Sequence, residues 1–290
     1  MAHRNPVGAA DGGPARQADF RPPAGPELDR WRDAAAEIAV RAGRLLGETF
    51  AGVHEEDCKG HEGNLVTEAD RASEALIVSL LRERFPAHAV RAEEGGGGGS
   101  HPVTWLVDPL DGTNNFAHAF PVFAVTIAAA HGDLVLAGVT YDPLRDELFA
   151  ARLGGGATLN GRRLAVSTRD RLSAALVATG FPYDKGTNPD NNLAQFCAVT
   201  PLVRGVRRCG SAALDLAYVA AGRLDAYWER GTAAWDVAAG LLLVQEAGGR
   251  VTDYDGAAAR LDGGRFVASN DRIHDPLLER LQWASKSTAS

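Results

Sequence analysis

The chain has 290 residues, of which 45% are hydrophobic and 23% charged, and its formal net charge is -7. This composition is typical of a soluble globular protein, and the longest uncharged apolar run, residues 121–130, is far shorter than the roughly 18–20 residues that span a bilayer. We therefore expect no membrane partner, and the lack of a Lys/Arg-rich block argues against a nucleic-acid partner. The three cysteines, Cys58, Cys197 and Cys209, form no Cys-x-x-Cys pair and predict free thiols in a reducing, cytoplasmic compartment.

The start of the chain differs in pattern from the rest. Residues 1–26 are rich in Gly, Ala, Pro and Arg and show neither a hydrophobic period nor the apolar run of a secretory signal, so we expect a disordered tail. From Leu28 to Leu45, apolar residues recur at steps of three and four, which predicts an amphipathic helix that ends near Gly52. The polar stretch 54–63 contains His, Cys and carboxylates in no zinc-like spacing, and we interpret it as a solvated loop.

Strands and helices fill the rest of the chain in two successive patterns. Up to about residue 174, short strands follow one another between turn signals and predict an antiparallel meander; beyond it, strands alternate with helices. The expected strands are 65–67, 89–92, 103–107, 122–130, 134–141, 147–151, 175–179, 206–207 and 224–228, and the expected helices are 68–85, 191–201, 211–222 and 236–247.

The change of pattern predicts how the chain is organised. After the tail, we expect an α+β lobe over residues 27–174 that carries metal-binding motifs and an α/β lobe over residues 175–290 that completes the site. No linker or repeat separates the lobes, so they should pack closely. Five glycines and a serine at 95–100 predict a flexible loop inside the first lobe.

The densest chemical signal is Asp108-Pro-Leu-Asp111-Gly-Thr, which follows a hydrophobic strand. Pro109 fixes the direction in which the chain leaves the strand, and the two carboxylates can then face one point. Gly112 and Thr113 open a helical turn whose amides can meet a phosphate. Two carboxylates with a backbone carbonyl suit Mg²⁺. The structural alternative is an Asx-rich turn between a strand and a helix.

Three further acidic positions strengthen the metal interpretation. Glu93-Glu94 ends the strand just before this motif in the chain, and Asp236 begins an apolar helix. Asp70 lies three residues after Thr67 and forms a capping box with it. Each acid at a helix start also has a purely structural explanation, because a carboxylate there stabilises the helix dipole.

Together these residues resemble the inositol monophosphatase family of Mg²⁺-dependent, lithium-sensitive phosphatases. The resemblance covers nearly all of residues 27–280 and rests on motifs that occur in the family's order. The motifs are Leu65-Val-Thr-Glu-Ala-Asp70, Glu93-Glu94, Asp108-Pro-Leu-Asp-Gly-Thr-Asn-Asn-Phe116, Trp235-Asp-Val-Ala-Ala-Gly240, Gly180-Phe-Pro-Tyr183 and residues 148–166.

The resemblance implies a role for each motif. Glu93, Asp108 and the Leu110 carbonyl would hold one Mg²⁺, and Asp108, Asp111 and Asp236 a second, with Glu93 reaching a third. Asp70 and Thr113 would act with Glu93 in catalysis by orienting and deprotonating a water molecule. The residues implied to bind substrate are Asp111, Gly112, Thr113, Gly210, Ser211, Ala212, Glu229 and Asp236.

The resemblance also implies a fold, a substrate and an assembly. The fold would be a mixed α/β, layered α-β-α-β-α sandwich, and the protein would be a homodimer that hydrolyses inositol monophosphate or a similar polyol phosphate. Alternative substrates are fructose 1,6-bisphosphate, 3′-phosphoadenosine 5′-phosphate and histidinol phosphate, and an alternative of another class is a non-catalytic interaction protein. Glu229 has its own alternative, a surface ion pair with Arg230.

The sequence departs from the family pattern at two places. Family members commonly carry Asp where this chain has Asn64, and a longer mixed loop where it has glycines after Glu94. Both departures concern the third ion and loop closure.

A phosphatase of the haloacid dehalogenase type would use Asp-x-Asp-Gly-Thr, but two residues separate Asp108 from Asp111 here.

Overall fold

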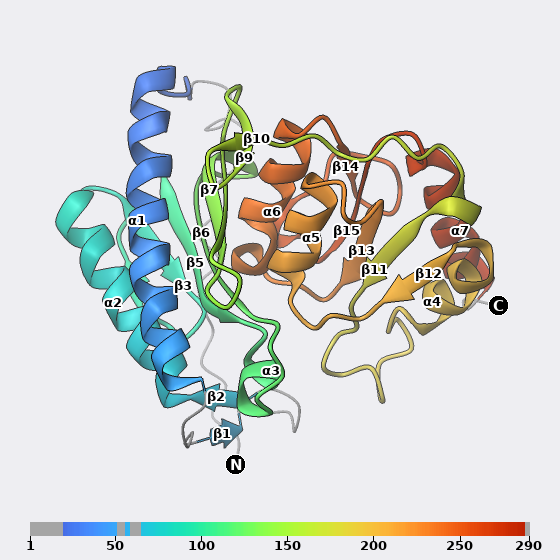
Figure 1. Ribbon diagram of the computed structural model, residues 1–290, viewed down its shortest axis with the longest axis horizontal. Helices are drawn as coiled ribbons and strands as arrows, with labels where there is room; N and C mark the ends of the chain where they lie inside the picture. The colour runs from blue at the N-terminus through green and yellow to red at the C-terminus, as the bar shows by residue number, and fades with distance from the viewer. Residues whose placement is uncertain (1–19, 51–55, 59–64, 288–290) are drawn as a thin grey trace, which may run out of the picture.

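The structure, a computed structural model, describes residues 20–50, 56–58 and 65–287. Helices and sheets alternate in five layers, as the family resemblance predicted (Figure 1). The helices are α1 Gly25–Thr49, α2 Glu68–Arg84, α3 Thr113–Ala117, α4 Leu193–Val199, α5 Ala212–Ala220, α6 Ala234–Glu246 and α7 His274–Ser287.

An eight-stranded sheet forms the second layer, behind α1 and α2. Its strand order is β10-β9-β8-β7-β6-β5-β3-β4, antiparallel except for the parallel pair β3 and β5. Both of its faces are covered, so β5, β6 and β7 are almost continuously buried rather than alternating. The strands are β3 Ala89–Ala92, β4 Gly97–Gly98, β5 Thr104–Asp111, β6 Ala124–His131, β7 Leu134–Asp142, β8 Glu147–Arg152, β9 Gly156–Leu159 and β10 Arg162–Arg163.

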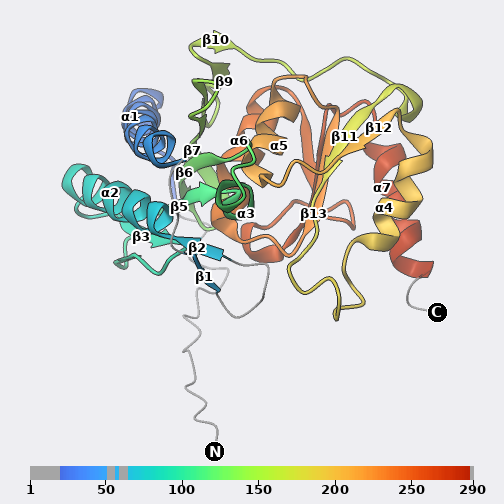
Figure 2. The ribbon, with the colours of Figure 1, turned by 60° about the horizontal axis from the view of Figure 1, so that its bottom comes forward.

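A five-stranded sheet forms the fourth layer, in the order β12-β11-β13-β15-β14. Helices α5 and α6 fill the space between the two sheets, and α4 and α7 cover the outer face of the second sheet (Figures 1 and 2). Because α6 is enclosed on both sides, every residue from Val237 to Val244 is buried. The strands are β11 Leu176–Thr179, β12 Gly205–Arg207, β13 Ala226–Arg230, β14 Arg250–Thr252 and β15 Arg265–Ser269; a separate pair joins β1 Glu56–Cys58 to β2 Leu65–Thr67.

Residues 20–26 were expected to belong to the tail, but they are part of the folded chain. Helix α1 begins at Gly25, and the ring of Phe20 stacks on His131 with 3.8 Å between the ring centroids. Phe20 also packs against the first hydrophobic core, so burial of this aromatic ring orders residues 20–24. Residues 1–19 lie outside the described part of the chain, as do Asn64 and most of the stretch 54–63.

The expectation of a flexible glycine loop is wrong for its centre. Gly97 and Gly98 form β4, which pairs antiparallel with β3. Gly97 has a φ of +122°, and a Cβ atom there would lie 2.2 Å from the Val90 carbonyl oxygen, so the pairing requires glycine. The glycines therefore allow a close backbone approach in addition to flexibility.

Most other expected elements are confirmed, with several ends displaced by a few residues and with several omissions. Strand β5 continues past Asp108 to Asp111, with a register shift between the two, and β13 runs on to Arg230 and so includes Glu229. Strands β1, β9, β10, β14 and β15 and helix α7 were not predicted, and β1 lies within the stretch 54–63 that was expected to be a loop. The division into lobes at residue 174 stays a prediction.

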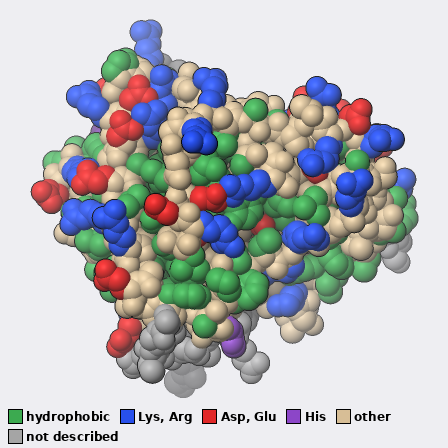
Figure 3. All heavy atoms as spheres, viewed as in Figure 1, with side chains coloured by type: hydrophobic (Ala, Val, Ile, Leu, Met, Phe, Trp, Pro, Cys, Tyr) green, Lys and Arg blue, Asp and Glu red, His purple; other side chains and the backbone are tan. Residues whose placement is uncertain are grey.

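The surface carries charges of both signs. Lys and Arg side chains are scattered over the face in Figure 3 and form no continuous patch there. No helix among residues 20–50 and 65–287 is both long and apolar enough to cross a bilayer.

Candidate active site

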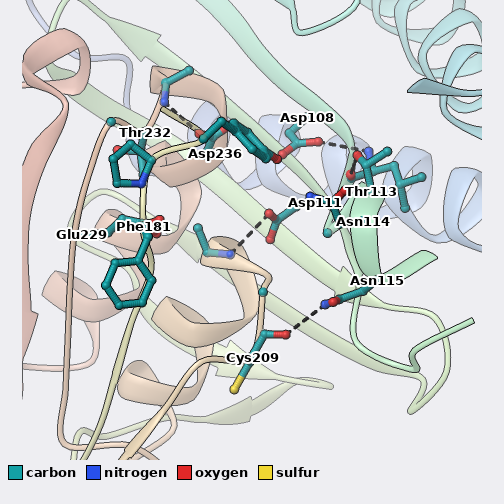
Figure 4. Close-up of a pocket in the computed structure, with 18 of the residues that line it drawn as sticks. Asp108, Asp111, Thr113, Asn114, Asn115, Phe181, Cys209, Glu229, Thr232 and Asp236 are labelled. Atoms are coloured by element: carbon teal, nitrogen blue, oxygen red, sulfur yellow. Dashed lines mark hydrogen bonds between the residues drawn. The ribbon is translucent and has the colours of Figure 1, made fainter. Parts of the chain in front are cut away.

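A cavity of about 630 Å³ brings the predicted site residues together, with the exception of Asp70 and Ser211. It is lined by residues of both sheets and of the loops that follow their strands (Figure 4). The sequence-predicted residues that line it are Glu93, Asp108, Leu110, Asp111, Gly112, Thr113, Gly210, Ala212, Glu229 and Asp236.

The turn from Asp108 to Thr113 is held by its own hydrogen bonds. Asp108 is only 2% exposed, and its Oδ1 accepts a hydrogen bond from the Leu110 amide at 3.0 Å. The Thr113 hydroxyl donates to the Leu110 carbonyl at 3.0 Å. Gly112 has a φ of +97°, and a Cβ atom there would lie 2.9 Å from a backbone carbonyl. The Asx turn that was expected as the structural alternative is therefore present. It does not exclude the metal interpretation, because Asp108 and Asp111 both line the cavity.

Asp111 links the end of β5 to the start of α5. Its carboxylate accepts hydrogen bonds from the Ser211 hydroxyl and from the Ala213 amide, the latter at 2.8 Å. The same hydroxyl accepts from the Leu214 amide and so caps α5, as predicted. Ser211 therefore positions Asp111 from behind the cavity and does not line it.

Helix α2 supports both the Glu93 segment and the Asp108 turn. The buried Glu74 carboxylate accepts hydrogen bonds from the amides of Glu94 at 2.7 Å and Gly96 at 2.9 Å. The hydroxyl of the preceding residue, Ser73, donates to the Pro109 carbonyl at 2.9 Å. Asp70 lies fully buried on this helix, and its charge acts on Asp108. Glu74 was missed from the sequence because its partners are backbone amides far along the chain.

Asp236 both stabilises the start of α6 and lines the cavity, so its structural and its functional interpretation are compatible. It lies in the first turn of α6, where its Oδ2 accepts a hydrogen bond from the Ala233 amide at 2.7 Å. Its carboxylate also faces the cavity opposite Asp108 and Asp111 (Figure 4). A helix start thus supplies one wall of the site.

The clustered carboxylates perturb one another strongly. Burial, followed by repulsion from Glu93, raises the pKa values of Asp108 and Asp236 well above their ordinary value. Burial also raises the pKa of Asp111 to about 6, although hydrogen bonds from Ser211 and the α5 amides oppose the shift. Negative charge held out of water in this way favours binding of a cation.

The donor chemistry fits Mg²⁺, which prefers oxygen ligands and keeps some of its water. Within the described residues, no three Asp, Glu, His or Cys side chains stand close enough to enclose an ion by themselves. The set expected for the second ion, Asp108, Asp111 and Asp236, is therefore not assembled as an enclosing group. An ion here would use carboxylates in pairs together with the Leu110 carbonyl or water, because that carbonyl has a second lone pair beside the one that Thr113 occupies.

Glu229 lies on another wall of the cavity and is 9% exposed. Its carboxylate accepts a hydrogen bond from the Tyr227 hydroxyl and packs against Gly180, where a Cβ atom would lie 1.9 Å from it. Burial raises the pKa of Glu229 to about 7. The alternative of a surface ion pair with Arg230 is wrong, because Arg230 pairs with Asp190 at 2.9 Å.

Two loops contribute several of the lining residues that were not predicted as site residues. The loop after β11 contributes Phe181, Tyr183 and Lys185, and the loop after β12 contributes Arg208 and Cys209. Phe181 and Tyr183 belong to the Gly180–Tyr183 motif of the resemblance, to which no role was assigned, and no local pattern marks Lys185, Arg208 or Cys209. Only the packing of the second sheet against the first brings these residues to the carboxylates. Cys209 and Cys197 are free thiols, as predicted, and the side chain of Cys58 lies outside the described part.

An αβαβα sandwich that gathers acidic side chains at a cavity between its sheets is the architecture expected of a metal-dependent phosphatase. The sequence profile of the inositol monophosphatase family matches residues 27–287, nearly the whole described chain. The protein therefore belongs to the inositol monophosphatase family, which is Mg²⁺-dependent in general, and its class is that of the phosphatases.

Individual relatives agree with this assignment. An inositol-1-monophosphatase from Synechocystis is 46% identical over 270 residues, covering 91% of this chain and 94% of the relative. A Nus factor SuhB from Pseudomonas aeruginosa is 46% identical over 260 residues, covering 84% and 94%. The solved structure of an inositol monophosphatase from Anabaena superimposes with a TM-score of 0.82 at 46% identity, covering 89% of this chain and 97% of the other.

Proposed function

We propose that this protein is a Mg²⁺-dependent phosphomonoesterase that hydrolyses inositol monophosphate or a similar polyol phosphate. The observation that carries the proposal is the presence of Glu93, Asp108, Asp111 and Asp236 in one cavity with Glu229. The names of two of the relatives described above, both inositol monophosphatases, support the substrate class.

Two or three ions would bind at this wall. Glu93, Asp108 and the Leu110 carbonyl would hold one, and Asp108, Asp111 and Asp236 would offer carboxylates in pairs to another, with water completing its ligands. When bound, Mg²⁺ supplies positive charge for the phosphoryl oxygens and activates water. Without such charge the carboxylates would repel a phosphate dianion.

The remaining roles belong to neighbouring groups. Asp70 and Thr113, with Glu93, would orient the attacking water and accept its proton, while the amides of Gly112 and Thr113 bind phosphoryl oxygens. Attack by water on phosphorus breaks the bond to the alcohol oxygen, which leaves with a proton. No Ser, Cys or His nucleophile is required.

The leaving alcohol would lie between Glu229 and the turn of Gly210, Ser211 and Ala212. A buried carboxylate can accept hydrogen bonds from ring hydroxyls, which favours a polyol over a simple alkyl phosphate. We further propose a homodimer, as the family resemblance implies, and a cytoplasmic location, as the cysteine pattern indicates.

The test is phosphate release from a panel of esters, each assayed with Mg²⁺ and with EDTA. The panel contains inositol 1-phosphate, fructose 1,6-bisphosphate, 3′-phosphoadenosine 5′-phosphate, histidinol phosphate and an aryl phosphate. Mg²⁺-dependent turnover with polyol phosphates ahead of the nucleotide and histidinol phosphate is expected. Absence of turnover on every ester would favour the alternative of a non-catalytic interaction protein, and a preference for the nucleotide or histidinol phosphate would refute the polyol assignment.

A further inference from the structure

Asn115 belongs to the Asp108–Phe116 motif, and none of the roles proposed above uses it. It lies on α3, and its side chain lines the cavity. Its Nδ2 donates to the Val122 carbonyl at 2.7 Å and to the Cys209 carbonyl at 2.9 Å, the second bond being drawn in Figure 4. A side-chain amide carries two protons on its nitrogen, so both are used on backbone carbonyls and the orientation of the amide is fixed.

The two carbonyls that Asn115 binds belong to different parts of the fold. Val122 lies just before β6 of the first sheet, whereas Cys209 lies 94 positions after Asn115, between β12 of the second sheet and α5. The chain continues from Cys209 into residues 210–212, which are proposed above to border the leaving alcohol. Asn115 therefore connects the motif that carries the metal ligands to the turn that borders the alcohol.

Gly210 allows the turn to approach Asn115 closely. A Cβ atom at position 210 would lie 2.8 Å from Nδ2 of Asn115 and 3.0 Å from its Oδ1. Gly210 also has a φ of +87°, a conformation that other residues adopt only with strain. A side chain at this position would therefore push the amide away from the Cys209 carbonyl.

A second connection between the same two segments runs through Asp111. Its carboxylate accepts hydrogen bonds from the Ser211 hydroxyl and the Ala213 amide. Asp111 is also a proposed metal ligand, so it must share its oxygens with an ion. Asn115 is a neutral amide that donates to backbone carbonyls, so its connection does not depend on whether an ion is bound.

We propose that Asn115 is a positioning residue that holds the turn of residues 209–212 against the metal motif and thereby supports recognition of the leaving alcohol. The proposal rests on the proposed phosphatase function and adds a residue that determines its specificity. Asn115 acts through the turn and does not touch the reacting atoms. The metal ligands Asp108 and Asp236 are held by other hydrogen bonds, from the amides of Leu110 and Ala233, so they should keep their places without it.

The experiment uses Asn115→Leu, because leucine is close to asparagine in shape and has no donor. The value of kcat/KM for inositol 1-phosphate should fall about 5- to 10-fold, mainly through KM, as expected for the loss of one or two hydrogen bonds between neutral groups. For an aryl phosphate, which has no ring hydroxyl, kcat/KM should fall much less. The Mg²⁺ concentration for half-maximal activity should stay unaltered. Gly210→Ala keeps the amide but displaces it, and should change the two substrates in the same way.

Asn270→Leu provides a matched control. The Nδ2 of Asn270 also donates to two distant acceptors, the Ser167 hydroxyl at 2.7 Å and the Arg169 carbonyl at 2.9 Å, and Asn270 does not line the cavity. The substitution removes at least as many hydrogen bonds as Asn115→Leu does. It should lower the Tm and leave the ratio of kcat/KM for the two substrates unaltered.

Three outcomes would overturn the proposal. Unaltered kcat/KM for inositol 1-phosphate in Asn115→Leu would show that the turn does not need Asn115. Equal losses on both substrates, or a raised Mg²⁺ requirement, would show that Asn115 supports the metal site or the fold. The same change of substrate ratio in Asn270→Leu would show a general effect of lost stability. If Asn115→Leu does not fold, Gly210→Ala decides by the same outcomes. Absence of wild-type turnover on every phosphate ester would instead refute the proposed function itself.

Discussion

Removal of Mg²⁺ should make the stability of this protein fall as the pH rises towards neutrality. Burial and mutual repulsion raise the pKa values of Asp108, Asp111, Asp236 and Glu229 in the folded state. The folded state therefore binds protons more tightly than the unfolded chain does. This contribution to stability is complete below about pH 4 and is lost as the pH rises through the folded-state pKa values.

Asp111 and Glu229 allow the magnitude to be worked out. The pKa of Asp111 rises from 3.8 to about 6, and that of Glu229 rises from 4.5 to about 7. Each shift corresponds to about 3 kcal/mol, since one pKa unit is about 1.4 kcal/mol. Partial exposure of Asp111 makes its figure an upper bound. The loss should fall mainly between about pH 4 and pH 7.

Urea unfolding in EDTA at several pH values, followed by fluorescence, measures this loss. Asp111→Asn should flatten the pH dependence, and Mg²⁺ should restore stability near neutral pH because it binds the folded state alone. Asp170→Asn, at an exposed surface position, serves as a control and should leave the curve unaltered. Metal-free stability that stays constant or rises between about pH 4 and pH 7 would refute the electrostatic reasoning.

Three further changes test individual parts of the site. Glu229→Gln should lower kcat/KM for a polyol phosphate by about 1–3 kcal/mol and that for an aryl phosphate much less; equal losses on both would place Glu229 in the metal site or the fold. Glu74→Ala leaves the Glu94 and Gly96 amides without their acceptor, so it should raise the Mg²⁺ concentration for half-maximal activity, with partial rescue in Glu74→Gln; an unchanged Mg²⁺ requirement would contradict this. Gly112→Ala places a Cβ atom 2.9 Å from a carbonyl at positive φ and should cost about 1–3 kcal/mol of stability, which an unchanged Tm would disprove.

The fold was predictable where a local pattern carries the information. The apolar period from Leu28 to Leu45 gives α1, and the strand before Asp108 gives most of β5. Gly97 and Gly98 could not be assigned to a strand, because glycine runs have no side-chain alternation and their pairing with β3 is a tertiary feature. The position of Phe20 was likewise not predictable, because its ring stacks on His131, which is distant in the sequence.

The residues of the site were likewise predictable where they are close in the sequence, and not where distant segments meet. Asp108 and Asp111 are three residues apart in one turn, whose geometry follows from Pro109 and Gly112, so the sequence could predict them as a pair. The hydrogen bonds from Glu74 to residues 94 and 96, and the arrival of Arg208 at the cavity, depend on segments far apart in the chain. Only the packed structure brings these side chains together.

Phosphate release by the Asp108→Asn variant tests the central claim most directly. Asp108 lies between Glu93, Asp111 and Asp236, whose charges all act on it, so removal of its charge should disable every ion that the site holds. We expect wild type and the Asp170→Asn control to release phosphate from inositol 1-phosphate with Mg²⁺ and to stop in EDTA, whereas Asp108→Asn loses at least about a thousandfold in kcat/KM although it remains folded. Turnover near the wild-type rate in Asp108→Asn, or undiminished turnover in EDTA, would contradict the assignment of this cavity as a metal-dependent phosphatase site.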